Sequence, residues 1–311
     1  LAGCGIWSLV GERLLAMAVR AVLLWRLSDW RPRGRGSVAS LRDMAPFSVS
    51  LMLTDLISTF YMKLPQFFLG KLYQTATLGA FDQAVKLKDM PVTAATQSVQ
   101  SVTFPALSEV RGDAPKFAES YRQAYVMFPA MLGLSAVAHD LFALLLSEKW
   151  MPTVPYFEVV CLAGLFYPVG MICYNVLKVM SHGPLIVRLE VVKKLLMTVV
   201  FAVTIPHSVM AVVWGLVVIA FGEMAVNFLA TRRFTRFTTC RFLRTLLPVA
   251  LVSGTMYLLV RLTACAVPGH LLLRLAAQLL VGAAAYVGLS VLFRLEAFGL
   301  LCDLMKKQAA R

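Results

Sequence analysis

The sequence predicts an all-α, polytopic transmembrane helix bundle of about nine spans. Hydrophobic residues make up 59% of the 311 residues and charged residues only 15%, whereas soluble domains are less apolar and more charged. Apolar stretches of about 20 residues, the length that crosses a bilayer, recur along the chain, and short breaks rich in Gly and Pro separate them. A disordered chain is excluded. A soluble helical bundle is disfavoured, because its helices would each carry a charged face.

Nine apolar segments are expected to form the spans. They are residues 6–27, 44–68, 78–107, 117–146, 154–177, 185–205, 210–229, 243–262 and 271–293. Four successive segments contain Pro65, Pro91, Pro129 and Pro168. Proline can break or kink a helix, and broken helices beside a polar cavity are common in transporters. These prolines either mark broken spans beside a cavity or are merely tolerated, as in ordinary spans.

Basic residues are distributed unevenly over the loops. If the loops alternate sides, 21 of the 30 lysines and arginines fall on one side, and only Lys71, Lys149, Arg261 and Arg274 fall on the other. Cytoplasmic loops are enriched in Lys and Arg, so the first side, which includes the C-terminus, is predicted to be cytoplasmic. This distribution explains the net charge of +14 without a nucleic-acid partner. Apolar and basic residues after Phe293 predict a short amphipathic helix at the interface.

Motifs of soluble enzymes are absent from the sequence. It contains no Walker loop, no GxSxG and no HExxH. The six cysteines include no CxxC pair, and the four histidines show no metal-ligand spacing. We therefore predict that the chain is not an enzyme and needs no metal or organic cofactor.

Ionisable residues inside the spans form two stripes. Such residues are costly in lipid and usually face a cavity. At 100° per residue, one stripe occupies an arc of about 100° on the segment 78–107, with Thr96 at its edge. Its members are Asp82, Lys86, Asp89, Thr93, Gln97 and Gln100. The segment 44–68 carries the second stripe, which consists of Ser48, Asp55, Thr59, Lys63 and Gln66, with Asp55, Thr59 and Lys63 as the candidate cavity residues. We predict that both stripes line a wet central cavity. The alternative is that they form hydrogen bonds between packed helices.

Two further pairs of polar residues lie on predicted helices. Glu190 and Lys194 are one helical turn apart, which predicts a structural ion pair. Glu223 and Asn227 share one face of the segment 210–229, so they either line a pore or support helix packing.

Several short pieces of the sequence stand in a specific order and spacing. They are Gly5-Ile6-Trp7-Ser8-Leu9-Val10, Trp30-Arg31-Pro32, Gly70-Lys71, Leu78-Gly79-Ala80-Phe81, Pro91-Val92-Thr93, Phe104-Pro105-Ala106-Leu107-Ser108, Glu148-Lys149-Trp150-Met151-Pro152, Asn175-Val176-Leu177-Lys178 and Arg188-Leu189-Glu190. In this order they resemble the polysaccharide flippases of the MOP (MATE-like) superfamily, the lipopolysaccharide biosynthesis proteins related to Wzx.

The resemblance implies an architecture of two six-helix lobes and two additional helices. On that pattern, residues 1–30 contain the last helix of a first lobe, and 31–42 form a cytoplasmic linker. Residues 43–235 form the second lobe, and 236–311 form the two additional helices and a cytoplasmic amphipathic tail. The remainder of the first lobe is expected upstream of Leu1, because alternating access needs two lobes.

The resemblance also implies a function. The expected cargo is a polyprenyl-pyrophosphate-linked oligosaccharide. It would move from the cytoplasmic to the periplasmic leaflet of the bacterial inner membrane, for lipopolysaccharide, O-antigen or exopolysaccharide biosynthesis. Lys63 and Lys86 would contact the cargo phosphates. The stripe aspartates would balance these lysines or take a coupling H⁺ or Na⁺. Membrane lipids are expected to surround the protein, with a polysaccharide polymerase and glycosyltransferases as further partners.

Two other functions stay open at this point. One is a MATE-type, cation-coupled drug antiporter, which would favour a net acidic cavity. The stripes hold three aspartates and two lysines, and this balance does not decide between an antiporter and a flippase. The other is a non-transporting membrane scaffold within a polysaccharide-assembly complex.

Overall fold

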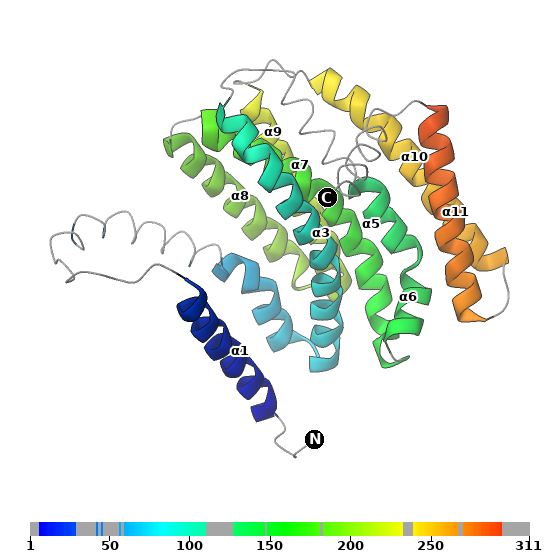
Figure 1. Cartoon of the computed structure of the whole chain (residues 1–311), viewed down its shortest axis with the longest axis horizontal. Coiled ribbons are helices and arrows are strands. Elements are labelled where there is room, and N and C mark those ends of the chain that lie inside the picture. Colours follow the sequence, from blue (N-terminus) through cyan, green and yellow to red (C-terminus); the bar gives the residue numbers. More distant parts are fainter. Residues whose placement is uncertain are drawn as a thin grey trace. The chain divides into compact units, whose positions relative to one another are not determined.

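The computed structural model divides into two compact units, Leu1–Ser58 and Thr59–Arg311. The described residues are 6–28, 42, 45, 56, 59–109, 127–146, 148–180, 183–232, 239–266 and 270–293. The elements formed by these residues are helices, so the all-α fold class is confirmed (Figure 1). Residues 31–41 of the predicted linker and the predicted amphipathic tail after residue 293 lie outside this part. The division of the chain into lobes remains a prediction.

The first unit contains α1 (Ile6–Leu27), whose bounds are those of the first predicted segment. Each side chain described along α1 is exposed, including the large apolar residues Trp7, Leu14 and Trp25. A helix with apolar side chains exposed on all sides needs lipid or further helices around it.

The second unit begins with a helix at residues 59–72, which a short turn at Tyr73 and Gln74 connects to the next helix. The remaining elements are α3 (Thr75–Glu109), α5 (Met127–Ala136), α6 (Ala138–Leu145), the 3-10 helix η1 (Glu148–Thr153), α7 (Val154–Met180), α8 (Gly183–Thr204), α9 (Val209–Thr231), α10 (Thr239–Ala266) and α11 (Leu271–Leu292). Each α-helix lies on a predicted apolar segment, because long apolar runs without turn signals favour helices that satisfy their own backbone.

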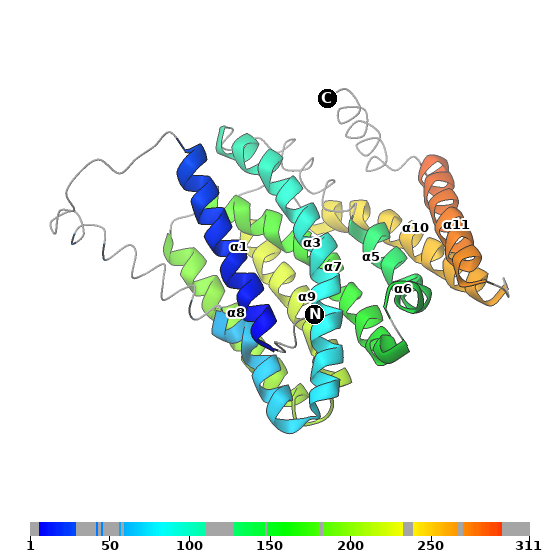
Figure 2. The ribbon, with the colours of Figure 1, turned by 60° about the horizontal axis from the view of Figure 1, so that its bottom comes forward.

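Helix α7 is the centre of the second unit. It packs against α3, α5 and α9, and it also contacts α6, α8 and η1. Helix α10 packs on α5, and α11 contacts both α10 and α6, so α5 and α6 lie between α7 and the α10–α11 pair (Figures 1 and 2). Gly170 lets α7 and α9 approach closely, since a Cβ atom there would lie 3.4 Å from the Cα of Met224.

The helix at 59–72 packs into a second apolar cluster with α8 and α9. Leu69 from this helix, Phe81 from α3, Phe201 from α8 and Val212 from α9 are buried together. The Tyr73 hydroxyl donates to the Ile205 carbonyl at 2.9 Å, which fixes the end of the 59–72 helix against the end of α8.

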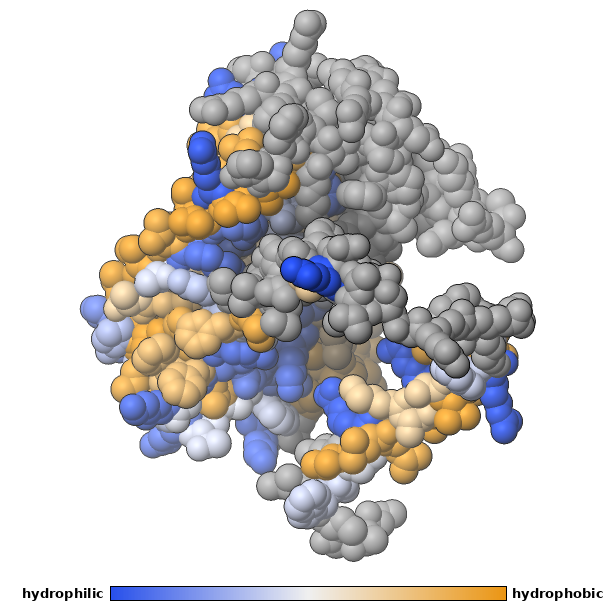
Figure 3. Space-filling view, turned by 90° about the vertical axis from the view of Figure 1, so that its left-hand side faces the viewer, coloured by the Kyte–Doolittle hydropathy of each residue, from blue (hydrophilic) through white to orange (hydrophobic). Residues whose placement is uncertain are grey.

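Large apolar side chains cover much of the outside of the second unit. On the face in Figure 3, broad hydrophobic areas are interrupted by hydrophilic side chains. On α8 the exposed apolar residues recur every four positions, at Val187, Val191, Leu195, Val199 and Val203. Soluble monomers rarely expose such continuous apolar surface. This exterior suits contact with lipid and confirms a multi-pass membrane protein.

Four helical stretches among the described residues are long and apolar enough to cross a membrane: Glu148–Leu177, Val209–Thr231, Leu246–Ala266 and Leu271–Leu292. A fifth is present if α5 and α6, which meet at an angle of 67°, cross together. Helices α3 and α8 are long enough, but several charged residues interrupt their apolar sequence. The predicted count of nine spans is therefore not confirmed.

The four prolines do not interrupt their helices. Pro91 lies inside the continuous α3, Pro168 inside α7 and Pro65 inside the 59–72 helix. Pro129 lies within α5. Of the two alternatives, the structure favours prolines that are tolerated within continuous helices. The break falls instead at Val137, whose φ of −93° and ψ of 3° end α5 and turn the chain into α6.

Candidate functional site

The predicted stripe on α3 lies at the edge of the packed bundle. Because α3 is continuous, Asp82, Lys86, Asp89 and Thr93 share one face of the helix. Lys86 and Thr93 are exposed, whereas Asp82 and Asp89 are half-buried. The exposed residues lie on one side of the stripe. Its other side turns toward α7, where Val92 would contact a Cβ atom at Gly164. The structure therefore leaves only part of the stripe open.

The C-terminal half of the stripe behaves differently. Thr96 is buried, and its hydroxyl donates to the Val92 carbonyl at 2.6 Å. Its polar atom is thus satisfied within α3 and needs no cavity. The side chains of Gln97 and Gln100 lie outside the described residues, so their place in the cavity stays a prediction.

Lys88 is a charged residue of α3 that the stripe did not include. Its Nζ lies 2.5 Å from Oδ1 of Asp89, and the Lys88 side chain is 18% exposed. It lies about 100° from Asp89 around the helix axis, so a search for one polar face left it out. A long aliphatic stem nevertheless lets a lysine ammonium reach a neighbouring carboxylate. One aspartate of the stripe therefore has a lysine partner already.

Asp82 is half-buried, but one of its carboxylate oxygens is fully shielded. Its Oδ1 atom is shielded from solvent and has no hydrogen-bond partner among the described residues. Buried carboxylate oxygens normally have a partner. Asp82 therefore differs from Asp89, whose carboxylate has a lysine partner.

The second stripe is only partly described. Thr59 and Lys63 are exposed, and Asp55 lies outside the described residues. Tyr61 lies on the opposite side of the same helix and contacts α8: its hydroxyl is 3.2 Å from that of Thr198. The Lys194 Nζ lies 5.3 Å from the centre of the Tyr61 ring. Because Tyr61 faces α8, Thr59 and Lys63 on the opposite side of the helix face away from α8.

The described members of both stripes belong to one helical hairpin. The 59–72 helix and α3 are connected by the turn at Tyr73 and Gln74 and run alongside each other (Figure 2). A Cβ atom at Gly70 would lie 3.2 Å from the Leu78 side chain, so the two helices are close where the turn joins them.

A cavity of about 230 Å³ with a mainly apolar wall lies among α7, α8 and α9. Glu223 and Asn227 both line it, as does Lys193. The Asn227 amide donates to the Gly170 carbonyl at 3.2 Å, so this residue supports helix packing while it also faces the cavity. Glu223 and Asn227 therefore line a cavity, and Asn227 also supports helix packing, so each of the two alternatives holds in part.

The predicted partner of Glu190 is wrong. Glu190 pairs with Lys193, one residue earlier than the expected Lys194. Lys193 is buried and lies 4.9 Å from the centre of the Tyr174 ring on α7, whereas Lys194 turns toward Tyr61. Neighbours at i+3 and i+4 are both in reach on a helix, and contacts with other helices decide between them.

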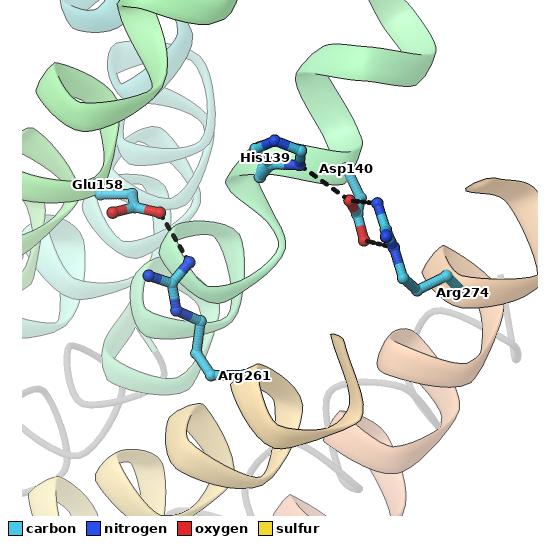
Figure 4. Close-up of polar contacts among 5 residues, drawn as sticks. All are labelled: His139, Asp140, Glu158, Arg261 and Arg274. Carbon is cyan, nitrogen blue, oxygen red and sulfur yellow. Dashed lines mark hydrogen bonds and ion pairs between the residues drawn. The ribbon is translucent and has the colours of Figure 1, made fainter. Parts of the chain in front are cut away.

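A third polar group, which the sequence analysis missed, links α6 and α7 to α10 and α11 (Figure 4). Arg274 from α11 binds both carboxylate oxygens of Asp140 from α6, with Nε 2.7 Å from Oδ2. His139 Nδ1 lies 3.1 Å from the same carboxylate. Arg261 from α10 binds Glu158 from α7, with Nη1 2.8 Å from Oε1. Sequence spacing could not find these pairs, because their members are 103 and 134 residues apart.

The two ion pairs border a cavity of about 600 Å³. Apolar residues such as Val154, Leu258 and Leu262 form much of its wall, and Gln278 also lines it. Asp140 is 3% exposed, whereas Arg261 is 43% exposed. One pair is therefore held inside the protein, and the other is close to the surface.

Comparison with known proteins identifies relatives of the same kind. The family described as "Polysaccharide biosynthesis protein" matches residues 1–155. The chain is 25% identical to the lipopolysaccharide biosynthesis protein WzxC of Escherichia coli over 50% of this chain and 33% of WzxC. It is 24% identical to a membrane protein encoded in the cps region of Klebsiella pneumoniae, over 71% of this chain and 47% of that protein. The resemblance to the polysaccharide flippases is thereby confirmed.

The fold agrees with that of a flippase. The lipid II flippase MurJ in an inward closed conformation superposes with a TM-score of 0.66 over 81% of this chain and 55% of MurJ, at 13% identity. The succinoglycan biosynthesis transport protein ExoT of Rhizobium meliloti is 22% identical over 54% of this chain and 35% of ExoT. The chain spans less than half the length of these curated relatives.

Proposed function

We propose that this chain forms part of a flippase that moves a polyprenyl-pyrophosphate-linked oligosaccharide from the cytoplasmic to the periplasmic leaflet of the bacterial inner membrane. The names of its relatives support transport in polysaccharide biosynthesis, and MurJ supports a flippase fold. A first lobe, a polymerase and glycosyltransferases remain proposed partners, and H⁺ or Na⁺ the proposed coupling ion. The proposed orientation places the C-terminus in the cytoplasm.

One observation carries this proposal: lysines are exposed on the hairpin formed by the 59–72 helix and α3. Lys63 and Lys86 are both exposed within segments that are otherwise mainly apolar. A lysine that faced lipid near mid-membrane would cost about 2.5–3.5 kcal/mol on insertion scales. A hydrated cavity removes this cost and presents two cations to a pyrophosphate, which favours charge-assisted hydrogen bonds.

The test is substitution of these lysines in the complete reading frame that encodes this chain. Lys86→Ala and Lys63→Ala should each reduce surface polysaccharide on the order of tenfold, about the value of one charge-assisted hydrogen bond. Protein levels should stay near normal, and Lys86→Arg should keep part of the activity because it keeps the charge. Immunoblots of the polysaccharide and of the protein measure both quantities.

Two exposed methionines supply matched controls. Met90 lies one turn from Lys86 on α3, and Met62 lies next to Lys63. Met90→Ala and Met62→Ala remove similar side-chain volume without removing charge, so both should support normal polysaccharide. Normal polysaccharide from both lysine variants would show that the phosphate contacts are wrong and would favour the scaffold alternative. Loss of drug resistance with intact polysaccharide would favour the antiporter.

A further inference from the structure

The α10–α11 pair meets the bundle through two kinds of contact. Along most of its length the contact is apolar, as where Met256 of α10 meets α5: its Cε would lie 3.6 Å from a Cβ atom at Gly133. At one end the contact is ionic, through Asp140–Arg274 and Glu158–Arg261. Each ion pair joins one helix of the bundle to one helix of the pair, so the two contacts are independent points of attachment.

Apolar contacts alone do not hold helices together well in a membrane. Lipid tails are as apolar as leucine, so packed apolar faces gain little over faces that contact lipid. A charged group separated from its partner, by contrast, must be moved to water or stay uncompensated. The ionic contacts therefore determine where α10 and α11 attach, although they involve only four side chains.

The four charged residues all lie at one end of the second unit. Asp140 and Glu158 flank η1, which connects α6 to α7. Arg261 and Arg274 flank the connection between α10 and α11. Both arginines are among the four basic residues that fall on the predicted periplasmic side, against the general charge bias. Each of them has a carboxylate partner, which accounts for its position there.

We propose that Asp140–Arg274 and Glu158–Arg261 act as a two-point latch that fixes the α10–α11 pair to the bundle of α5, α6 and α7, so that the pair moves with this bundle as one body. The Asp140–Arg274 contact is the stronger point, because it is bidentate and Asp140 is 3% exposed. Arg261 is more exposed, so water weakens its contact with Glu158. The latch does not depend on which cargo the protein carries.

A cysteine reporter tests the latch in membranes that contain the full chain. In a background with the six native cysteines replaced by alanine, Met256→Cys places a thiol at a position that is 5% exposed at the α5–α10 contact. Maleimide should label this thiol slowly when the latch is intact. Arg274→Gln should raise the labelling rate on the order of tenfold, and Arg261→Gln should raise it less, because local opening exposes the contact.

Rescue and control variants separate the latch from general destabilisation. The double charge exchange Asp140→Arg with Arg274→Asp restores an ion pair and should return the labelling rate toward that of the parent. A second reporter, Val213→Cys, lies fully buried on α9 and should stay protected in every variant. Glu190→Gln breaks an ion pair within α8 and should leave the Met256→Cys reporter unchanged.

Two results would overturn the proposal. One is an unchanged labelling rate at Met256→Cys in both Arg274→Gln and Arg261→Gln. The other is an equal rise at the Met256→Cys and Val213→Cys reporters, which would show that the substitutions unfold the whole unit rather than release α10 and α11.

Discussion

Charged residues on α3 and those between α6 and α11 differ in what they contact. Lys86 on α3 is exposed, at the edge of the bundle. Arg274 on α11 donates twice to a carboxylate that is 3% exposed. Both residues lie in helices of a membrane protein, where a lone charge is costly. On α11, a carboxylate of the protein offsets the cost of the Arg274 charge. On α3, Lys86 stays available for a partner from outside the protein.

This difference separates structural from functional charge. Removing a paired charge leaves its partner uncompensated and should lower stability. Removing an exposed charge leaves nothing behind and should change only what binds there. Lys88 and Asp89 are an intermediate case, because they pair with each other while the Asp89 side chain is 50% exposed.

Cysteines at the two ends of the second unit should differ most in their reactivity with a label added from outside. Cysteines introduced at the exposed positions Lys149 and His270 should react with an impermeant maleimide added outside, because both lie at the predicted periplasmic end. A cysteine at Arg232, which is also exposed, should react only after the membrane is opened. If all three react from outside, the orientation is wrong and the paired arginines lose their explanation.

Asp140→Asn should have the largest effect on stability among the charged residues. It leaves the Arg274 guanidinium facing a neutral amide, at a cost of about 2 kcal/mol. The midpoint of thermal unfolding in detergent should fall by about 4–8 °C. An unchanged midpoint would mean that water replaces the carboxylate fully, so that the pair is not structural.

Glu158→Gln should have a smaller effect of the same kind. The side chains of Glu158 and Arg261 are 25% and 43% exposed, so solvent screens their attraction. A loss of about 0.5–1 kcal/mol is expected, measured by the same unfolding midpoint. A fall larger than that of Asp140→Asn would reverse the order of the two contacts.

Lys86→Ala should have the smallest effect on stability, within about 0.5 kcal/mol, as for exposed positions without a structural partner. Its unfolding midpoint should therefore match that of the Met90→Ala control, even while surface polysaccharide falls. A marked loss of stability would place Lys86 with the structural charges and break the comparison.

The positions of the helices could be predicted because the thickness of the bilayer sets the length of each apolar run. Apolar runs long enough to cross a bilayer start and stop at polar residues, and α11 begins at the residue that the sequence indicated. The break at Val137 could not be found in this way, because no proline or glycine stands at this position. The prolines could not locate it either, since proline is tolerated in spans where neighbouring helices fix the chain.

For the candidate site, the sequence could predict only which residues share one face of α3. Periodicity placed Asp82, Lys86, Asp89 and Thr93 on one face of α3. It could not show which edge of that face turns toward α7, because this depends on a neighbouring helix far along the chain. The pairs Asp140–Arg274 and Glu158–Arg261 were invisible for the same reason. A charge balance between sequence-distant helices leaves no local pattern.

The two lysines in the middle of α8 have a consequence for how the chain enters the membrane during synthesis. Lys193 contacts Glu190 of its own helix and Tyr174 of α7, and Lys194 lies over Tyr61 of the 59–72 helix. Tyr174 and Tyr61 belong to helices that precede α8 in the sequence, so the ribosome delivers both to the translocon before α8 arrives. Vectorial synthesis thus supplies α8 with its stabilising neighbours in time. A circularly permuted gene that begins with α8 would release these lysines into lipid without them.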